Sequence, residues 1–489
     1  MAKPKKGISN FYLIAIFLIL AEIVILGYTS YISHSFWYDE AYTIALIKYS
    51  FEDIWKITAI DVHPPLYYYM LKAFCKLFVD IRLSMRIFSG LGIIACFLLG
   101  AFPIKRLLGE KTALTFMLLL IIMPVTQYLG SEIRMYSWAM FFVLGCAVFA
   151  YKVYLRRIFI NYILMALFAI GAAYTHYYAL VSVGIIYILL SIAILQQKRN
   201  IVRLILFGLI VLLAYSPWIP AFISQIQSVQ RNFWIETPVP KDYLLFLYYF
   251  FSPKEPSHPY TVFNLLVMAT ALSVMLLLIA AGVFFVTRLP KTKRLATAHA
   301  FVFVYILVFV VTLGITYLIK PISVPRYTSC MLGPLLLGVA VYCTELWKHK
   351  QKILVSASFI WLALLSAARF VSEAQYNKIQ DRELIEISEF LDRGTREPKT
   401  MISSLQSYPE LAKLSVLMPN RNYYLHSPAD ETDYRPFEIT TIDSIPDNTE
   451  SYFRIQSIND STAVSDKYTV SDELILKDKS IQLLTKKHR

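Results

Sequence analysis

The sequence predicts an all-α polytopic membrane protein with about 11 transmembrane helices, outer-face interfacial helices and a small C-terminal extracytoplasmic α/β domain. The first observation is composition: 57% of the 489 residues are hydrophobic and only 16% are charged. The second is that apolar runs recur from residue 11 to about residue 368, many of them about 20 residues long, which is enough to cross a bilayer. The third is that these runs stop near residue 370, where the charge balance also changes sign. Together these observations exclude a soluble core for the first 370 residues.

The charge balance separates two domains, a transmembrane domain at 1–370 and a soluble domain at 371–489. The second segment holds 15 Lys+Arg and 20 Asp+Glu, whereas the first holds 32 and 13. The basic excess therefore belongs to the membrane part, where it reports on topology and lipid phosphate rather than on nucleic acid. The five cysteines are scattered and mostly within apolar runs, so they predict neither a disulfide framework nor a metal cluster.

Basic clusters predict the orientation of the spans, because short cytoplasmic loops are enriched in Lys and Arg. Six clusters carry three or four basic residues each: Lys3/Lys5/Lys6, Lys105/Arg106/Lys111, Lys152/Arg156/Arg157, Lys198/Arg199/Arg203, Arg288/Lys291/Lys293/Arg294 and Lys348/Lys350/Lys352. The predicted spans that alternate with them are 9–31, 83–104, 112–130, 136–153, 159–174, 178–195, 204–222, 261–286, 298–319, 327–346 and 353–369. Eleven spans place the N-terminus in the cytoplasm and the C-terminal domain outside.

Residues 64–79 are apolar but short, and Lys72 and Lys76 lie on one face at helical spacing. This pattern is typical of an interfacial helix rather than a span. We therefore expect one outer loop at 32–82 with two surface helices, at about 50–60 and 64–79. In the tail, the pattern predicts helices at 383–391 and 408–417 and strands near 400–404, 422–426, 452–456 and 473–476.

The predicted outer ends of separate spans hold the polar groups of a candidate site. Adjacent carboxylates follow the first span, and charge beside a span is costly unless it has a function. The candidate residues are Asp39, Glu40, Asp61, His63, Tyr67, Glu132, Arg134, Tyr136, His176, Tyr177, Arg326 and Tyr327. Each motif also has a structural alternative: solvated loop acids at Asp39 and Glu40, a helix-start residue at His63, a pair that anchors helix ends at Glu132 and Arg134, a structural turn at His176 and an interface anchor at Arg326. Glu22, alone on an apolar helix, is expected to pair with a neighbouring helix and is assigned no role.

At these motifs a resemblance emerges. Asp39-Glu40, His63-Pro-Pro-Leu-Tyr67-Tyr, Glu132-Ile-Arg134-Met-Tyr136-Ser, Thr-His176-Tyr177 and Arg326-Tyr327 follow one another over about the first 340 residues. This succession resembles the polyprenyl-phosphate-sugar-dependent membrane glycosyltransferases of the C-type fold, which include protein O-mannosyltransferases and the lipid A aminoarabinose transferase. The resemblance implies a lipid-linked sugar donor used on the outer face and a catalytic or donor-site carboxylate in the first loop. The acceptor-facing loops and the tail depart from those proteins, so the acceptor does not carry over.

The residues support the same chemistry directly. An enzyme outside the cytoplasm has no supply of nucleotide sugars, so an activated hexosyl or pentosyl unit must arrive on a lipid such as a polyprenyl phosphate. Asp39 would then accept the proton of a glycolipid, glycan or protein acceptor in one inverting displacement, with Glu40 orienting or sharing that role. Arg134 and Arg326 would bind the leaving phosphate, and His63, His176, Tyr67 and Tyr136 would line the sugar.

Two other classes of protein are polytopic as well. A transporter or flippase should place polar residues near the midplane of interrupted helices, whereas these groups gather at one face. A polysaccharide ligase or polymerase should concentrate function in one large outer loop. No cofactor is required; a divalent metal at Asp39, Glu132 and a histidine fits the residue types, although no tight ligand spacing demands it. The expected location is the bacterial inner membrane.

Overall fold

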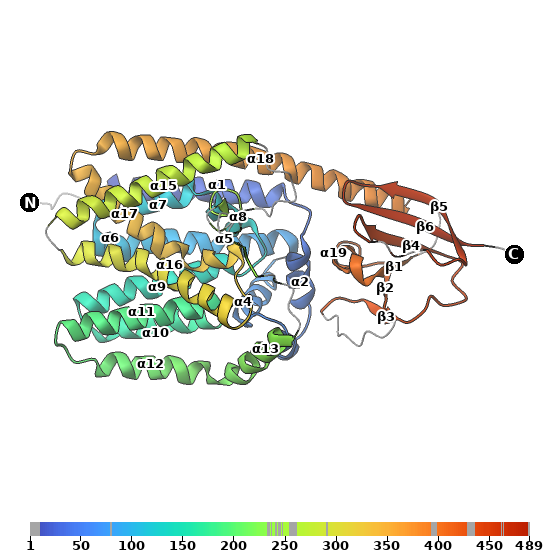
Figure 1. Cartoon of the computed structure of the whole chain (residues 1–489), viewed down its shortest axis with the longest axis horizontal. Helices are drawn as coiled ribbons and strands as arrows, with labels where there is room; N and C mark the ends of the chain where they lie inside the picture. The colour runs from blue at the N-terminus through green and yellow to red at the C-terminus, as the bar shows by residue number, and fades with distance from the viewer. Residues whose placement is uncertain are drawn as a thin grey trace, which may run out of the picture. The chain divides into compact units, whose positions relative to one another are not determined.

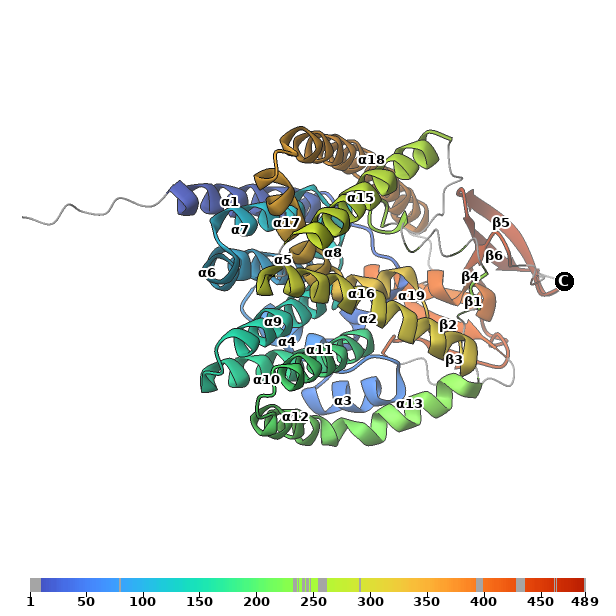
Figure 2. The ribbon, with the colours of Figure 1, turned by 60° about the vertical axis from the view of Figure 1, so that its left-hand side comes forward.

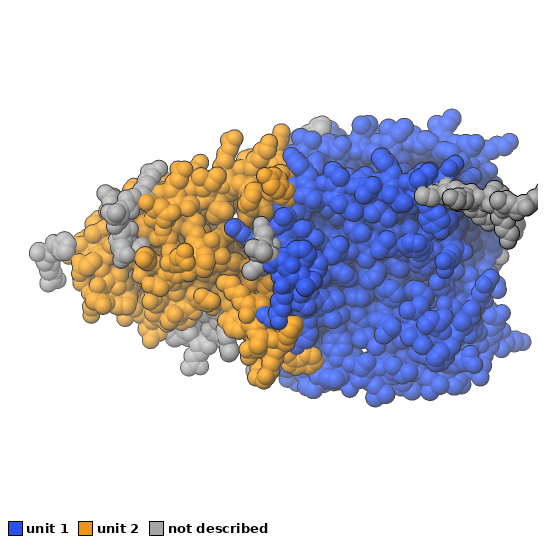
Figure 3. Space-filling model, turned by 180° about the vertical axis from the view of Figure 1, so that it is seen from behind, with its two compact units in different colours: residues 1–30, 58–372 blue, residues 31–57, 373–489 orange. Residues whose placement is uncertain are grey.

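The chain folds into two compact units in a computed structural model. It describes residues 10–78, 81–231, 262–289, 292–392, 399–427, 436–460 and 464–487, with residue 462 and, between 232 and 261, residues 235, 237–239, 242, 246 and 248–253. The basic residues Lys3, Lys5, Lys6 and Lys291 of the predicted clusters lie outside these ranges. Unit 1 holds residues 1–30 and 58–372, and unit 2 holds residues 31–57 and 373–489 (Figure 3).

Unit 1 is helical, and its long helices run side by side (Figures 1 and 2). Its α-helices are α1 (Asn10–Tyr31), α4 (Leu66–Cys75), α5 (Ile81–Leu99), α6 (Lys105–Leu108), α7 (Glu110–Ile122), α8 (Pro124–Ser131), α9 (Tyr136–Leu155), α10 (Phe159–Ala173), α11 (Tyr177–Gln196), α12 (Val202–Tyr215), α13 (Ile219–Arg231), α15 (Val262–Arg288), α16 (Lys293–Leu318) and α17 (Leu332–Lys348). Short π or 3₁₀ segments are η1 (Gly100–Ile104), η2 (Ser216–Trp218) and η4 (Pro325–Met331). Three helices have residues in both units: α3 (Phe51–Ile60), α18 (Lys352–Asp392) and α1, whose last residue Tyr31 belongs to unit 2.

The predicted spans are confirmed as helices, and the chain is an integral membrane protein. Among the described residues, nine helices are long and apolar enough to cross a membrane. The two other predicted spans differ from a simple helix. The segment at 159–174 forms the 15-residue helix α10, and the segment at 112–130 is divided between α7 and α8, which meet at an angle of 70°.

The bend between α7 and α8 follows from Pro124. Proline has no amide hydrogen and disfavours a helical conformation in the residue before it, so Met123 is extended and α8 restarts at Pro124. The Val125 amide, which would donate to Ile121 O in a continuous helix, donates instead to Phe250 O at 3.2 Å. The Gln127 side chain takes the place of the Val125 amide as the donor to Ile121 O, with its Nε2 at 3.1 Å from that oxygen.

Unit 2 contains α2 (Tyr38–Leu46) and an α/β fold, as the tail pattern predicts. Its other elements are η5 (Leu405–Ser407), α19 (Tyr408–Leu417) and the strands β1 (Thr400–Ser404), β2 (Asn422–His426), β3 (Thr440–Ile442), β4 (Ser451–Ser457), β5 (Tyr468–Ile475) and β6 (Lys479–Lys486). The sheet order is β3-β2-β1-β4-β6-β5; β1 to β4 pair in parallel, and β6 pairs antiparallel with β4 and β5. One face of the sheet buries Leu411 and Leu414 of α19 together with Ile387 and Phe390 of α18.

The predicted outer loop at 32–82 has three helices in the structure, not two. The expected surface helices correspond to α3 and α4, but the sequence analysis missed α2. Residues 31–57, which the sequence assigns to the transmembrane domain, belong to the same compact unit as residues 373–489. The reason is apolar contact, because Ala41 and Ala45 of α2 pack against Ala412 and Phe437.

Candidate functional site

Ten of the twelve predicted site residues belong to unit 1, and Asp39 and Glu40 belong to unit 2. The unit 1 residues come from four segments that are far apart in the sequence. These segments are η4 and three turns with the first residues of the helices that follow them: the turn between α3 and α4, the turn between α8 and α9, and the turn between α10 and α11.

The turn before α4 presents Asp61 and His63. Pro65 is the residue before the first turn of α4, and the Leu66 amide donates to Tyr174 O at 3.0 Å, which joins this turn to the one before α11. Asp61 Oδ2 lies 3.6 Å from His63 Nδ1. Burial raises the pKa of Asp61, but His63 and the charge of Arg134 outweigh it, so the net pKa is lowered and the carboxylate stays ionised.

His176 is at the centre of an aromatic cluster. Its Nδ1 accepts a hydrogen bond from the Tyr178 amide at 3.1 Å, so in the neutral ring the hydrogen is on Nε2. Its ring centroid lies 4.9 Å from that of Tyr327 and 5.5 Å from those of His63 and Tyr136. Nε2 is buried and has no hydrogen-bond partner among the described residues, and the same holds for the Tyr136 hydroxyl. Two buried polar groups are therefore available to a ligand.

The pKa of His176 is lowered by burial and by three basic side chains. Burial lowers its pKa well below the ordinary value, and the charges of His63, Arg134 and Arg326 lower it further. His176 is therefore neutral at pH 7, and it can donate one hydrogen bond without adding charge.

Arg134 and Arg326 are both buried, at 2% and 8% exposure. The Arg134 amide donates to Glu132 O at 2.8 Å, and its Nη1 donates to the Tyr68 hydroxyl at 3.4 Å. The guanidinium of Arg326 lies 5.7 Å from the Tyr327 ring centroid. Two arginine side chains that both act electrostatically on His176 are an arrangement suited to a phosphate group.

The structure also shows which neighbours support the turn before α9. The Tyr128 hydroxyl donates to Glu132 Oε1 at 3.3 Å, and Arg86 Nη1 donates to Ser131 O at 2.7 Å. Sequence reasoning missed Arg86 and Tyr128, and it quoted Tyr68 in the motif after His63 without assigning it a role. Arg86 offered a signal, since it is a charged residue within an otherwise apolar span.

Tyr67 and Tyr177 contact other helices. The Tyr67 hydroxyl is 2.9 Å from Ser89 Oγ of α5, and the Tyr67 side chain is fully buried. The Tyr177 hydroxyl donates to Gln225 Oε1 and accepts from Trp218 Nε1 at 3.1 Å. Both phenols therefore hold helices together around the cluster.

Glu22 has a partner on the helix that leads into the site. Gln127 Nε2 donates to Glu22 Oε2 at 2.9 Å as well as to Ile121 O, so one amide group joins α1 to the break before α8. Glu22 is fully buried, and its Oε1 has no hydrogen-bond partner among the described residues. The expected pairing of Glu22 with a neighbouring helix is observed, and its partner helix α8 ends at Ser131, next to Glu132.

In unit 2, Asp39 and Glu40 lie in the first turn of α2. Glu40 is buried, and its Oε2 accepts a hydrogen bond from the Trp37 amide at 3.3 Å, which caps the helix. Asp39 is half-buried. The segment before α2 is held by Asp381 of α18, whose Oδ1 accepts the His34 and Ser35 amides at 3.2 Å.

The residues that pack against the first turn of α2 are aromatic. We use the name α2 platform for α19 together with Phe437. The Tyr38 ring centroid lies 5.7 Å from that of Phe437 and 6.0 Å from that of Tyr408, and the Tyr42 ring lies 6.2 Å from Phe437. These contacts fix the first turn of α2, where Asp39 is located.

The residue types of Asp39, Glu132 and a histidine would suit a divalent metal. Among the residues that the structure describes, no group of three or more His, Cys, Asp or Glu side chains is arranged to hold a metal ion.

Comparison with known proteins identifies solved structures that share the fold of this chain. No protein-family model matches the sequence, and no curated protein matches it. Among solved structures, ArnT from Cupriavidus metallidurans in the apo state has a TM-score of 0.60 at 11% identity, covering 96% of this chain and 97% of that chain. The structure of the same protein bound to undecaprenyl phosphate has a TM-score of 0.60 at 12% identity, covering 97% and 98%. The chain therefore shares the ArnT-like fold over nearly its whole length.

Proposed function

We propose that this protein is a glycosyltransferase that moves a sugar from a polyprenyl-phosphate donor to an acceptor on the outer face of the membrane. The observation that carries the proposal is the buried cluster of Arg134, Arg326 and neutral His176, whose Nε2 is without a partner among the described residues. The shared fold supports it, because ArnT has been crystallised bound to undecaprenyl phosphate.

The phosphate of the donor would bind to Arg134 and Arg326. A guanidinium donates two parallel hydrogen bonds to phosphate oxygens and remains charged at any physiological pH. Burial strengthens this interaction, because little water competes for the phosphate. His176 Nε2 and the Tyr136 hydroxyl would donate to the sugar or to a phosphate oxygen.

The transfer is a single inverting displacement. The acceptor hydroxyl attacks C1 of the sugar and loses its proton to the Asp39 carboxylate. The bond between C1 and the phosphate oxygen breaks, and its electron pair leaves with the polyprenyl phosphate. Glu40, whose carboxylate caps α2, acts by orienting Asp39.

The transporter alternative receives less support. A transporter should have its polar groups at the midplane, whereas Arg134, His176 and Arg326 lie at or beside helix ends. A ligase or polymerase of envelope polysaccharide shares the lipid-linked donor chemistry, so the acceptor distinguishes it.

The test measures sugar transfer by the full-length protein from a panel of polyprenyl-phosphate sugars, including aminoarabinose and mannose. Asp39→Asn is expected to lower the rate about 10²- to 10⁴-fold, the usual contribution of a general base. Asp53→Asn, at a carboxylate of the adjacent helix α3, serves as the matched control and should keep the wild-type rate. Transfer by Asp39→Asn at the wild-type rate would exclude Asp39 as the base.

A parallel uptake assay with the same sugars in sealed vesicles tests the alternative class. Accumulation inside vesicles without any transfer product would favour a transporter. Profiling glycolipids and glycoproteins of a strain lacking the protein identifies the acceptor.

A further inference from the structure

A groove in unit 1 lies beside the basic residues Arg106 and Lys152. A groove with a volume of about 350 Å³ runs between α5 with η1 and α9. Its wall is apolar, with Leu98 and Phe102 on one side and Phe141 and Phe149 on the other. Arg106 and Lys152 line the same groove.

The length of the groove suits one acyl chain. The lining residues extend from Ala95 to Arg106 on one side and from Phe141 to Lys152 on the other. Each interval is 11 residues, or about 16 Å of helix at 1.5 Å per residue. Half the hydrocarbon thickness of a bilayer is about 15 Å, so a chain in the groove would reach from the headgroup level to the midplane.

The backbone of η1 contributes to the shape of the groove. Residues Gly100–Ile104 form a π-helical turn with Pro103 inside it. Phe102, in this turn, is 50% exposed and lines the groove. Single π-helical turns are frequent at functional sites, because the extra residue redirects side chains.

The two cations of the groove form no ion pair with the described part of the chain. Among the described residues, Arg106 and Lys152 have no carboxylate partner; Lys152 lies 4.4 Å from the Phe149 ring centroid. The nearby Glu110 is 3.2 Å from Lys105 instead.

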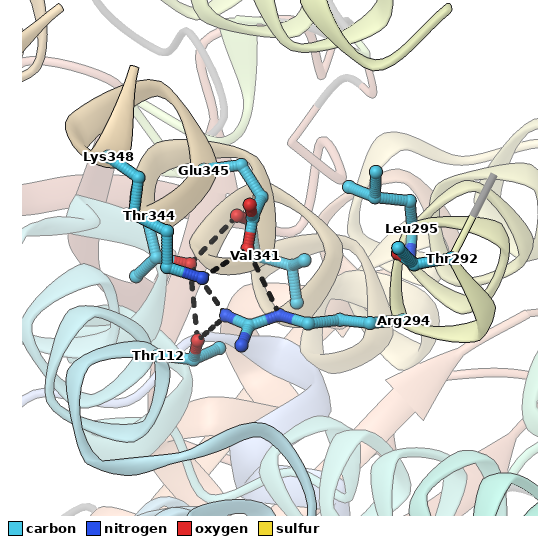
Figure 4. Close-up of polar contacts among 8 residues, drawn as sticks. All are labelled: Thr112, Thr292, Arg294, Leu295, Val341, Thr344, Glu345 and Lys348. Carbon is cyan, nitrogen blue, oxygen red and sulfur yellow. Dashed lines mark hydrogen bonds and ion pairs between the residues drawn. The ribbon is translucent and has the colours of Figure 1, made fainter. Parts of the chain in front are cut away.

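The other carboxylate at the basic ends of the helices is also engaged. Glu345 of α17 binds Lys348 at 2.8 Å and Arg294 at 3.3 Å, and Arg294 also donates to Thr344 Oγ1 at 3.0 Å and to Thr112 Oγ1 (Figure 4). Glu110 and Glu345 are therefore both paired with basic residues other than Arg106 and Lys152.

We propose that this groove binds an anionic phospholipid of the bilayer, with its phosphate at Arg106 and Lys152 and one acyl chain along the apolar wall. Basic pockets between transmembrane helices are a known form of headgroup site. This site is separate from the proposed donor site, and its test does not depend on sugar transfer.

The experiment is a lipid titration of the purified full-length protein in detergent, followed by native mass spectrometry. The probes are dioleoyl phosphatidylglycerol and dioleoyl phosphatidylcholine, which have the same chains but differ in net charge. We expect the wild-type protein to bind phosphatidylglycerol more tightly than phosphatidylcholine. The double variant Arg106→Gln with Lys152→Gln should bind phosphatidylglycerol about 30-fold more weakly, because both cations that interact with the anionic headgroup are removed.

Two further variants make the test specific to the groove. Arg199→Gln with Arg203→Gln removes the same charge from another basic cluster and should change the affinity less than about threefold. Ala95→Phe keeps both cations but fills the groove, and it should also weaken binding. Equal binding of the two lipids, equal loss in both double variants, or wild-type binding by Ala95→Phe would each overturn the proposal.

Discussion

At the scale of single residues, burial determines the protonation state of His176. Its folded pKa is well below 6.5, so the unfolded chain binds a proton at pH values where the folded protein does not. Stability from this group is fully present above pH 6.5 and is lost as the pH falls toward the folded pKa. We therefore expect the unfolding temperature to fall on acidification from about pH 7.5 to about pH 5. His176→Gln should show a smaller fall in a thermal-unfolding assay in detergent.

The control for this prediction is His349→Gln, at an exposed histidine of the same chain. It should retain the pH dependence of the wild type. If His176→Gln and the wild type lose the same stability on acidification, another group is responsible for the pH dependence.

At the scale of elements, α8 depends on one side chain, because the break at Pro124 leaves the Ile121 carbonyl to the Gln127 amide. Gln127→Leu would leave Ile121 O and Glu22 Oε2 buried without this donor, at a cost of about 1–3 kcal/mol for each unsatisfied group. We expect a lower unfolding temperature and weaker donor binding, since α8 leads directly to Glu132 and Arg134. Gln227→Leu, at an exposed position of α13, should have neither effect. Unchanged donor affinity in Gln127→Leu would show that α8 does not position those residues.

The α2 platform is the second element that supports the proposed site. Phe437→Ala removes the ring that contacts Tyr38 and Tyr42, and large-to-small changes of a buried Phe cost about 3–5 kcal/mol. We expect faster hydrogen exchange in α2 and a lower kcat for sugar transfer, with the donor KM little changed, because Asp39 would be less well oriented. Phe437→Leu, which keeps a large apolar side chain, should retain most of the protection of α2 from hydrogen exchange and most of the kcat. A normal kcat with fast exchange in α2 would mean that the platform does not position Asp39.

At the scale of the whole molecule, the eleven predicted spans place the two chain ends on opposite sides of the membrane. All five native cysteines are buried, so single exposed cysteines can be labelled against a low background. We expect Asp466→Cys, in the C-terminal domain, to react with an impermeant maleimide in intact cells. His349→Cys, between α17 and α18, should react only after permeabilisation. The opposite pattern would reverse the orientation and place the proposed site in the cytoplasm.

Much of the fold could be predicted because its signals are local. The apolar runs located the spans, and the spacing of apolar residues located the strands β1 and β2 and the helix α19 in the tail. Local pattern also found His63, His176 and Tyr327, which the structure brings together from three separate turns. It did not find α2, whose nine residues have no long apolar face and are stabilised by contact with Ala412 and Phe437.

The sequence by itself determined that this is an integral membrane protein with a C-terminal α/β domain, because hydrocarbon requires long apolar helices and hydropathy records their positions. Only the tertiary structure decided what individual polar residues contact. It placed Glu40 at a helix cap, turned Tyr67 toward Ser89 and gave Glu22 its partner Gln127. The physical reason is that a hydrogen bond depends on the direction of a side chain and on a partner distant in sequence, and neither is encoded in local periodicity.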